Sequence, residues 1–292
     1  MSGASTAGGT GTSSRGVARH AVDVVVVTAG SGVRMGGVEK GLIPIAGRPA
    51  LSWSLDAFAA DPRVRRIALV VGAEQLVTYA TLDWLPESVV TVVPGGATRA
   101  ASVLAGITAL ADAPGVGGDL LLVHDAARPL LDAATLDRVI VATNASGAAI
   151  PVMPIADTLK RVAAGDPRRS GGTVDRTALV AAQTPQGVAA RHLAALSEAL
   201  RTALEESTDE ASLLEGLGIE VRLVDGDARL RKITIPSDVE LLSALAGEAV
   251  ERGSSAAARA LEARIRAAGS NLRVGWGDDV HPIGSAGTLV LG

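Results

Sequence analysis

Residues 22–36 read VDVVVVTAGSGVRMG, in which a run of β-branched residues leads directly into a glycine-rich turn. The valines predict a short strand buried on both faces, because such strands are continuous apolar runs. Glycines that follow a strand let backbone amides approach a phosphate group. Arg34 lies in this turn and Lys40 follows it, so the pair of cations predicts a triphosphate-binding loop. A purely structural turn is the alternative interpretation.

The same alternation of strand and helix continues to about residue 246. Further apolar runs predict buried strands at 67–71, 89–93, 119–123, 148–152 and 219–224. Helical patterns cover residues 50–60, 99–111, 133–144, 189–206 and 237–250, and a further short helix is expected to start near Thr208–Glu210. This order predicts an α/β protein with a mostly parallel sheet covered by helices. Ligands of such sheets bind beyond the carboxyl ends of the strands, so functional residues are expected just after each run.

Three segments depart from this pattern. Residues 156–188 are rich in glycine, proline and charge, which predicts an exposed excursion such as a hairpin arm leaving the sheet. Residues 1–20 are rich in glycine, serine and threonine and are expected to be a disordered tail. Residues 247–271 predict a helical linker, after which 272–292 begin a new strand. We therefore expect a main domain over residues 21–246.

The composition excludes several classes of protein. A formal net charge of -4 argues against a nucleic-acid binder that uses a broad basic surface. With no cysteine, the chain has no disulfide, thiol nucleophile or cysteine-zinc site. No apolar run approaches the roughly 20 residues of a membrane-spanning helix, and the first residues lack the apolar core of a signal peptide. We expect a cytoplasmic protein without nucleic-acid or membrane partners.

The basic residues are unevenly divided. Of 27, only Lys40, Lys160 and Lys232 are lysine, which indicates positions that need a compact ammonium group, although chance retention is the alternative.

Polar residues follow two of the predicted strands. Gly95-Gly96 precede Arg99 and Ser102, and His124-Asp125 precede Arg128. Asp125 is suited to hold Mg²⁺ or its waters, with a helix cap as the alternative, and His124 is expected to be structural.

The motifs together resemble a known family. GSGVRM (30–35), Lys40, GG (95–96), HDAARP (124–129), DTLK (157–160), TVDR (173–176), TPQ (184–186), TDEAS (208–212) and KIT (232–234) are similar to the motifs of 2-C-methyl-D-erythritol 4-phosphate cytidylyltransferases, in the same order. All three lysines fall inside these motifs. The resemblance covers roughly residues 22–246. It implies a Rossmann-like nucleotidyltransferase sheet with a protruding β-arm at residues 156–176 that forms a homodimer.

The resemblance also implies a reaction and a set of site residues. CMP would pass from CTP to 2-C-methyl-D-erythritol 4-phosphate in non-mevalonate isoprenoid precursor biosynthesis, with Mg²⁺ accompanying CTP. The residues implied in binding CTP are Ala29, Gly30, Gly32, Gly96, Ser102 and Ala126. The cations implied in catalysis are Arg34, Lys40 and Lys232. The residues implied in binding the acceptor are Asp125, Arg128, Thr184 and Lys232, with Thr158 and Arg176 arriving from the partner's arm.

The carboxyl-terminal residues carry a second resemblance. RVGWGDDVH (273–281) is similar to the opening of 2-C-methyl-D-erythritol 2,4-cyclodiphosphate synthase, and Asp279 and His281 match its Asp-x-His metal ligands. Residues two apart on a strand share a face, so both could reach one Zn²⁺. This implies the truncated start of the second half of a bifunctional enzyme. With a third ligand lacking, no cyclase activity is expected of these 292 residues.

Alternatives remain at this point. The same loop and lysines would serve a cytidylyltransferase for another polyol or sugar phosphate. A dinucleotide-binding dehydrogenase is disfavoured because Met35 stands where the fingerprint has its third glycine. A non-catalytic nucleotide-binding module would be free to lose Lys40 or Lys232. Thr28, Gly41 and Ala97 depart from the family pattern, which leaves the selectivity for CTP open.

Overall fold

The computed structural model describes residues 20–28, 39–202 and 209–247 of the chain. The internal contacts divide the chain into two compact units. Unit 1 comprises Met1–Gly30, Leu55–Asp125 and Asp132–Asp227. Unit 2 comprises Ser31–Ser54, Ala126–Leu131 and Ala228–Gly292.

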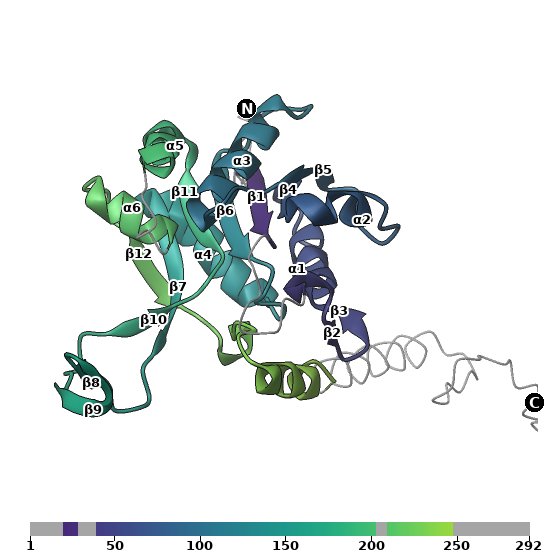
Figure 1. Ribbon diagram of the computed structural model, residues 1–292. Helices are drawn as coiled ribbons and strands as arrows, with labels where there is room; N and C mark the ends of the chain where they lie inside the picture. Colours follow the sequence, from purple (N-terminus) through teal and green to yellow (C-terminus); the bar gives the residue numbers. More distant parts are fainter. Residues whose placement is uncertain (1–19, 29–38, 203–208, 248–292) are drawn as a thin grey trace, which may run out of the picture. The chain divides into compact units, whose positions relative to one another are not determined.

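Unit 1 is built on a sheet of eight strands (Figure 1). They are β1 (Val22–Val27), β4 (Val64–Val71), β5 (Val89–Pro94), β6 (Leu120–Asp125), β7 (Ala148–Pro154), β10 (Val180–Ala182), β11 (Gln186–Ala189) and β12 (Arg222–Asp225). Their order is β10-β7-β11-β6-β1-β4-β5, with β12 also paired to β7. β1 runs parallel to β4 and β6, whereas β10 and β11 are antiparallel to their neighbours. The predicted α/β class with a mostly parallel sheet is confirmed.

The helices predicted over residues 50–60, 99–111 and 133–144 are present, whereas the short helix at Leu76–Ala80 was not predicted. The helices are α1 (Ala50–Ala59), α2 (Leu76–Ala80), α3 (Arg99–Asp112), α4 (Ala133–Ser146), α5 (Leu193–Thr202) and α6 (Glu210–Gly216), with short 3-10 helices at Lys40–Leu42, Ala73–Gln75, Ala190–His192 and Ala228–Leu230. Apolar residues of α3, α5 and α6 share one core with sheet residues such as Val25, Val70 and Val123. Among the described residues, no helix has the length and apolar character needed to cross a bilayer.

Side-chain caps mark the start of three helices of unit 1, α3, α4 and α6. The side chain of Thr98 accepts a hydrogen bond from the backbone of residue 101, that of Asp132 from residue 135, and that of Asp209 from residue 212. Such caps satisfy backbone N–H groups that have no partner within the helix. As a consequence, Arg99 and Glu210 are each the first residue of a helix.

The predicted hairpin arm is confirmed. Among the described strands, β8 (Lys160–Ala163) and β9 (Asp166–Thr173) pair only with each other, and every residue of β9 is exposed. Figure 1 shows this hairpin apart from the eight-stranded sheet of unit 1. An isolated two-stranded hairpin is at best marginally stable in water, so little within the described chain stabilises the arm.

The predicted end of the exposed excursion at residue 188 is wrong. Gln183, Thr184 and Gln186 are buried, and β11 lies between β6 and β7. This strand has only four residues and contains a glutamine and a glycine, so it lacks the apolar pattern of its neighbours. A Cβ atom at Gly187 would lie 2.0 Å from Oγ1 of Thr143, which means that only glycine fits the packing against α4.

Two strands are less buried than predicted. The run at 219–224 yields only β12, an edge strand in which Leu223 is 49% exposed. The run at 89–93 yields β5, which is half-buried at the opposite edge. An edge strand has a neighbour on one side only, and this is a property of sheet order that an apolar run does not encode. The helix predicted over 189–206 also begins later, at α5, after a 3-10 turn.

Unit 2 has a core of its own. Its buried apolar residues come from three separated stretches of chain and are Ile43, Ile45, Ala50, Ala127, Leu130, Ile233, Leu242 and Ala246. Strands β2 (Pro44–Ile45) and β3 (Arg48–Pro49) form a small hairpin whose turn residues Ala46 and Gly47 have positive φ angles of 47° and 78°. A helix over residues 236–247 completes the described part of the unit.

A buried ion pair ties the sheet to the end of α3 in unit 1. Nη2 of Arg66 donates to Asp23 Oδ2 at 2.6 Å, and both side chains are less than a tenth exposed. Nη1 of Arg66 donates to the carbonyls of Leu110, Ala113 and Pro114, which lie at the helix end. The guanidinium group therefore serves both as a counter-ion and as a cap for the helix carbonyls.

We expect Arg66→Met to lower the free energy of unfolding by about 3–5 kcal/mol, because it leaves Asp23 as a buried charge without its partner. Urea denaturation at pH 7 measures this difference. Arg65→Met is the matched control, since the Arg65 side chain is exposed. A loss below about 1 kcal/mol in Arg66→Met, similar to a surface substitution, would contradict the structural role of the pair.

Candidate active site

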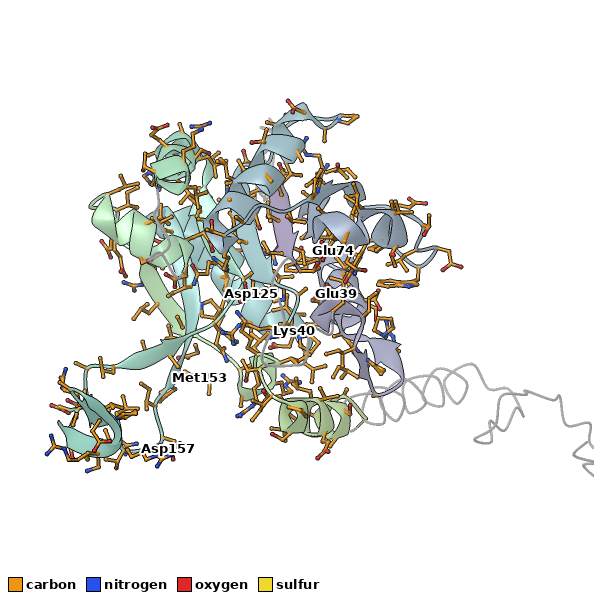
Figure 2. The ribbon with its side chains drawn as sticks, in the orientation of Figure 1. Glu39, Lys40, Glu74, Asp125, Met153 and Asp157 are labelled. Carbon is orange, nitrogen blue, oxygen red and sulfur yellow. The ribbon has the colours of Figure 1, made fainter. Side chains whose placement is uncertain are left out.

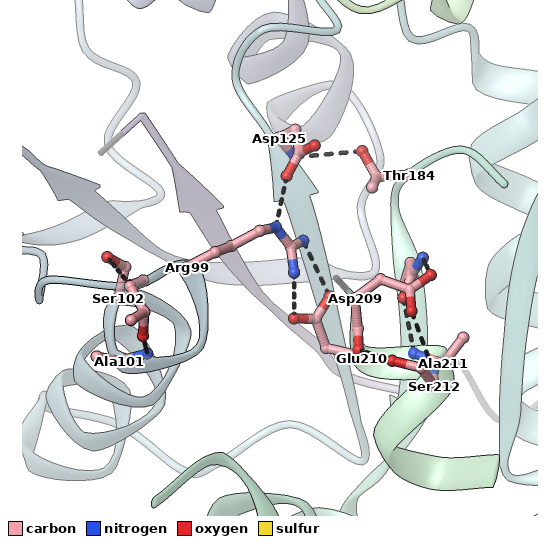
Figure 3. A network of polar contacts seen from close by, with 11 residues as sticks. Arg99, Ala101, Ser102, Asp125, Thr184, Asp209, Glu210, Ala211 and Ser212 are labelled. Atoms are coloured by element: carbon pink, nitrogen blue, oxygen red, sulfur yellow. Dashed lines mark hydrogen bonds and ion pairs between the residues drawn. The ribbon is translucent and has the colours of Figure 1, made fainter. Parts of the chain in front are cut away.

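Asp125 ends strand β6 of unit 1, at the carboxyl edge of the sheet where ligands bind (Figure 2). Its Oδ1 atom accepts a hydrogen bond from Nε of Arg99 at 3.1 Å. The two terminal nitrogens of Arg99 donate to the two carboxylate oxygens of Glu210, at 2.7 and 3.0 Å (Figure 3). One guanidinium group is thus shared by the carboxylates of Asp125 and Glu210, which lie 85 residues apart in the chain.

The start of α3 brings the predicted nucleotide-binding residues of unit 1 together. The backbone N–H of Gly96 donates to the Ser102 hydroxyl at 3.1 Å, and that hydroxyl donates to the carbonyl of Thr98 at 2.9 Å. A Cβ atom at Gly96 would lie 2.5 Å from the Cβ atom of Ala101. Glycine is therefore required at position 96 for the turn to approach the helix.

Thr184 links β6 to the turn before β11. Its hydroxyl accepts a hydrogen bond from the backbone N–H of Asp125 at 3.2 Å and lies 3.1 Å from Nδ1 of His124. His124 has no exposed surface, and its ring packs edge-on against Phe58. The interpretation of His124 as a structural residue is confirmed.

The TPQ and TDEAS motifs meet through Gln186. Its Nε2 atom donates to Oδ2 of Asp209 at 2.9 Å, and its Oε1 atom accepts from the backbone N–H of Ala211 at 3.0 Å. Asp209 is also the cap of α6, so β11 holds the first turn of that helix in place. Because Glu210 follows Asp209, its carboxylate is positioned by the same contacts.

Burial and neighbouring charges have opposite effects on the pKa values of Glu210 and Arg99 in this cluster. Burial raises the pKa of the Glu210 carboxyl, and the nearby positive charge of Arg99 opposes that rise. Arg99 remains charged because its two carboxylate partners outweigh the cost of its own burial and raise its pKa. The cluster carries two carboxylates and one guanidinium, a formal charge of −1 when all three are ionised.

Unit 2 gathers three of the predicted cations on one segment, residues 228–233. Nζ of Lys40 donates to the carbonyl of Ile233 at 3.1 Å. Nη1 of Arg128 donates to the carbonyl of Leu230 at 2.7 Å. Lys232 is the residue before Ile233 and belongs to this segment. The backbone carbonyls of the same segment accept hydrogen bonds from the other two cations, Lys40 and Arg128. Lys40 and Arg128 reach this segment from distant parts of the chain.

A buried carboxylate holds the turn that follows Lys232. Asp238, only 1% exposed, accepts hydrogen bonds from Arg231 Nε at 2.6 Å and from the backbone N–H groups of Thr234 and Ile235 at 2.8 and 3.0 Å. It also accepts from the Thr234 hydroxyl at 2.7 Å. Burial favours the neutral acid, but these hydrogen bonds outweigh that effect and lower the pKa of Asp238 well below its usual value.

We expect Asp238→Asn to lower the free energy of unfolding at pH 7 by about 2 kcal/mol, because it weakens charge-assisted hydrogen bonds to a buried group. A carboxyl whose pKa is lowered on folding stabilises the protein above its unfolded pKa of about 3.9 and loses that contribution as the pH falls towards the folded pKa. The difference between wild type and variant should therefore shrink below about pH 4.

Urea denaturation between pH 7 and pH 3 measures this dependence. Asp83→Asn is the control, because Asp83 is exposed and its variant should match wild type across the range. A difference that stays constant down to pH 3 would show that the ionised form of Asp238 is not what stabilises the turn.

The arm carries the residues predicted to act across a dimer interface. Thr158 and Arg176 are exposed, as is Lys160. Nη1 of Arg176 donates to the carbonyls of Ile155 and Ala156, at the base of the arm, where Figure 2 also marks Asp157. Arg176, which follows the second strand of the arm, is thus hydrogen-bonded to the residues that precede the first strand.

Several predicted site residues lie outside the described part of the chain. These are Ala29, Gly30, Gly32 and Arg34 of the glycine-rich loop, and Asp279 and His281 of the carboxyl-terminal segment. Ala126 is described and buried. Within the described residues, no three His, Cys, Asp or Glu side chains come together as a metal site. A Mg²⁺ that enters with a triphosphate needs only one or two carboxylates, and Asp125 fits that requirement.

A family model for 2-C-methyl-D-erythritol 4-phosphate cytidylyltransferase matches residues 22–248. The chain belongs to this family. The cytidylyltransferase of Acidithiobacillus ferrooxidans (strain ATCC 53993 / BNL-5-31) is 38% identical over 235 residues, which are 79% of this chain and 98% of the relative. The crystal structure of the cytidylyltransferase from Thermus thermophilus matches with a TM-score of 0.61 and 34% identity, over 77% of this chain and 98% of that one. The predicted nucleotidyltransferase fold is confirmed.

Bifunctional relatives are similar over a longer stretch. The bifunctional enzyme IspD/IspF of Rhodospirillum rubrum is 37% identical over 271 residues, or 92% of this chain. The chain spans 63% of the length of that relative. The likeness to bifunctional enzymes that the sequence predicted is thereby confirmed.

The pairing of Arg99 with Glu210 beside Asp125 was not predicted from the sequence. Glu210 lies within the TDEAS motif and Arg99 follows the glycine pair at 95–96, but neither residue is among those that the resemblance implies for the site. The available signal is that each residue is charged and directly follows the residue that caps a helix. Arg99 follows the cap Thr98, and Glu210 follows the cap Asp209. Nothing in either local pattern names the other residue as its partner.

Proposed function

We propose that this chain transfers CMP from CTP to 2-C-methyl-D-erythritol 4-phosphate and releases pyrophosphate, in isoprenoid precursor biosynthesis. The observation that carries the proposal is the set of cations in unit 2. Lys40 and Arg128 bind the backbone on either side of Lys232, so three positive groups serve one small region. Such a set suits a reaction between two polyanions. Family membership supplies the identity of both substrates.

The chemistry requires charge neutralisation rather than a general base. An oxygen of the 4-phosphate group attacks the α-phosphorus of CTP in line, the bond from that phosphorus to the β-phosphate oxygen breaks, and pyrophosphate leaves. A phosphate is already a competent nucleophile near neutral pH. Catalysis then consists of positioning the two substrates and stabilising negative charge around the reacting phosphorus.

The residues divide between these tasks. Lys40 and Arg34 would bind the triphosphate, and Lys232 would neutralise the charge that develops on the reacting phosphates. The backbone of Ala29, Gly30, Gly32 and Gly96 would hold the nucleotide, near Ser102 and Ala126. Asp125, Arg128 and Thr184 would face the acceptor. Magnesium would enter with CTP and screen the phosphate charges, and Asp125 is the carboxylate that would help to hold it.

We further propose a homodimer formed through the arm, residues 156–176. The hairpin β8–β9 makes no pairing outside itself among the described strands, which supports a contact with a second chain. Thr158 and Arg176 would reach the partner's acceptor site. Residues 272–292 are proposed to begin a cyclodiphosphate synthase domain with Asp279 and His281 as metal ligands, on the strength of the long match to bifunctional relatives.

Pyrophosphate release tests the proposed function. The protein is incubated with CTP, Mg²⁺ and 2-C-methyl-D-erythritol 4-phosphate, and parallel reactions replace the acceptor with ribitol 5-phosphate or a hexose phosphate, or replace CTP with ATP. Turnover with the first pair alone supports the proposal. Faster turnover with another acceptor would assign a different cytidylyltransferase, and CTP binding without turnover would assign a nucleotide-binding module.

A further inference from the structure

The Arg99 guanidinium group is divided between two carboxylates in an asymmetric way (Figure 3). Its fork, Nη1 and Nη2, binds both oxygens of Glu210, whereas only Nε binds Asp125. The Glu210 side chain is 1% exposed, that of Asp125 11% and that of Arg99 23%. The site residue Asp125 thus receives the single bond, and the deeply buried Glu210 receives the bidentate one.

Arginine prefers to bind a carboxylate through two parallel hydrogen bonds. Without Glu210, rotation about the side-chain bonds of Arg99 would let its fork close on Asp125 instead. Glu210 prevents this, because both Nη atoms are already bound. The direction in which Asp125 is held therefore depends on a residue that lies behind Arg99.

Glu210 is itself held independently of Arg99. Its neighbours Asp209 and Ala211 are both bonded to Gln186, and Gln186 pairs with Val123 in the register of β11 and β6. Val123 lies two residues before Asp125 on the same strand. Glu210 and Asp125 are thus attached to one rigid piece of sheet, and Arg99 spans the gap between their carboxylates.

We propose that Glu210 is a positioning residue for the transfer reaction, which binds the fork of Arg99 and thereby limits Asp125 to one hydrogen bond from that side. The proposal rests on the proposed function in one respect, namely that Asp125 faces the acceptor. A guanidinium fork closed on Asp125 would turn its carboxylate away from the acceptor hydroxyls. Glu210 therefore acts on acceptor binding, although it does not touch the substrate.

The test is the variant Glu210→Gln, which keeps the size of the side chain and can still accept one hydrogen bond from Arg99. We expect KM for the acceptor to rise about 10-fold and KM for CTP to rise by a clearly smaller factor, because Asp125 faces the acceptor directly and reaches CTP only through Mg²⁺. Glu215→Gln is the matched control, on an exposed position of the same helix. Equal losses for both substrates would indicate general damage to the fold and would overturn the proposal.

A double-mutant cycle separates positioning from a merely structural role. In an Asp125→Asn background, Glu210→Gln should change KM for the acceptor by less than about 2-fold, since the group it positions is already altered. If the two effects multiply instead, Glu210 acts independently of Asp125 and the proposal is wrong. If Glu210→Gln fails to fold, Glu210→Asp replaces it in the cycle, because it retains the charge but shortens the reach.

A measurement made without substrate tests the positioning role of Glu210 separately from the proposed reaction. The Nε–H signal of Arg99, identified by its loss in Arg99→Lys, is followed by NMR of ¹⁵N-arginine-labelled protein. In wild type the Nε–H should exchange slowly with water, and in Glu210→Gln at least about 10-fold faster as the fork turns towards Asp125. Unchanged exchange would overturn the proposal whatever the reaction catalysed. Absent turnover with slow exchange would instead overturn the proposed function alone.

Discussion

Replacing Lys232 by alanine is expected to lower kcat of CMP transfer by about 10²-fold or more, and Lys40→Ala should have an effect of similar size. Each change removes a positive charge from a reaction in which negative charge gathers on the transferred phosphorus. The two lysines act at the same segment. Lys232 belongs to it, and Nζ of Lys40 binds the carbonyl of the next residue, Ile233. Lys40→Ala therefore removes both a charge and a contact that holds the segment.

Steady-state kinetics with CTP and methylerythritol phosphate measure these losses. Arg201→Ala is the control, because Arg201 is a surface cation on α5 whose ion pair with Glu198 is exposed. Lys40→Arg and Lys232→Arg test whether charge alone suffices. A variant that keeps near-wild-type kcat with alanine at position 40 or 232 would remove that lysine from the proposed mechanism.

Mixing two inactive variants is expected to restore activity if the arm acts across a dimer. In the proposed homodimer, Arg176 serves the partner's site, whereas Lys40 serves its own. A heterodimer of Lys40→Ala and Arg176→Ala subunits therefore contains one site with both residues intact. Random exchange of subunits in equal amounts should recover about a quarter of wild-type activity, since about half of the dimers carry one working site of two.

The experiment needs proof that subunits have exchanged. Differently tagged variants, co-purified as heterodimers, provide it and should show about half of wild-type activity per dimer. Mixing Lys40→Ala with Lys232→Ala is the control that should recover little, because both residues belong to the same site. Verified heterodimers without recovered activity would place Arg176 in the site of its own subunit or outside the site.

Much of the fold could be predicted because its signals are local. The valine run at 22–27 and the leucine run at 120–123 became buried neighbouring strands, and the caps Thr98 and Asp209 start helices at the expected places. Strand β11 could not be predicted. Its burial comes from the strands on either side of it, and its residues Gln186 and Gly187 were selected by contacts with α6 and α4 rather than by strand periodicity.

By itself, the sequence determined the α/β class, the hairpin arm and the family, because periodicity and spaced motifs are encoded in short stretches of chain. Only the tertiary structure decided which charged groups are partners. Arg99 and Glu210 are 111 residues apart, and Lys40 and Ile233 are 193 apart. No local pattern specifies such pairs, since they arise when packing of the core brings distant segments together and each buried charge must find a compensating group.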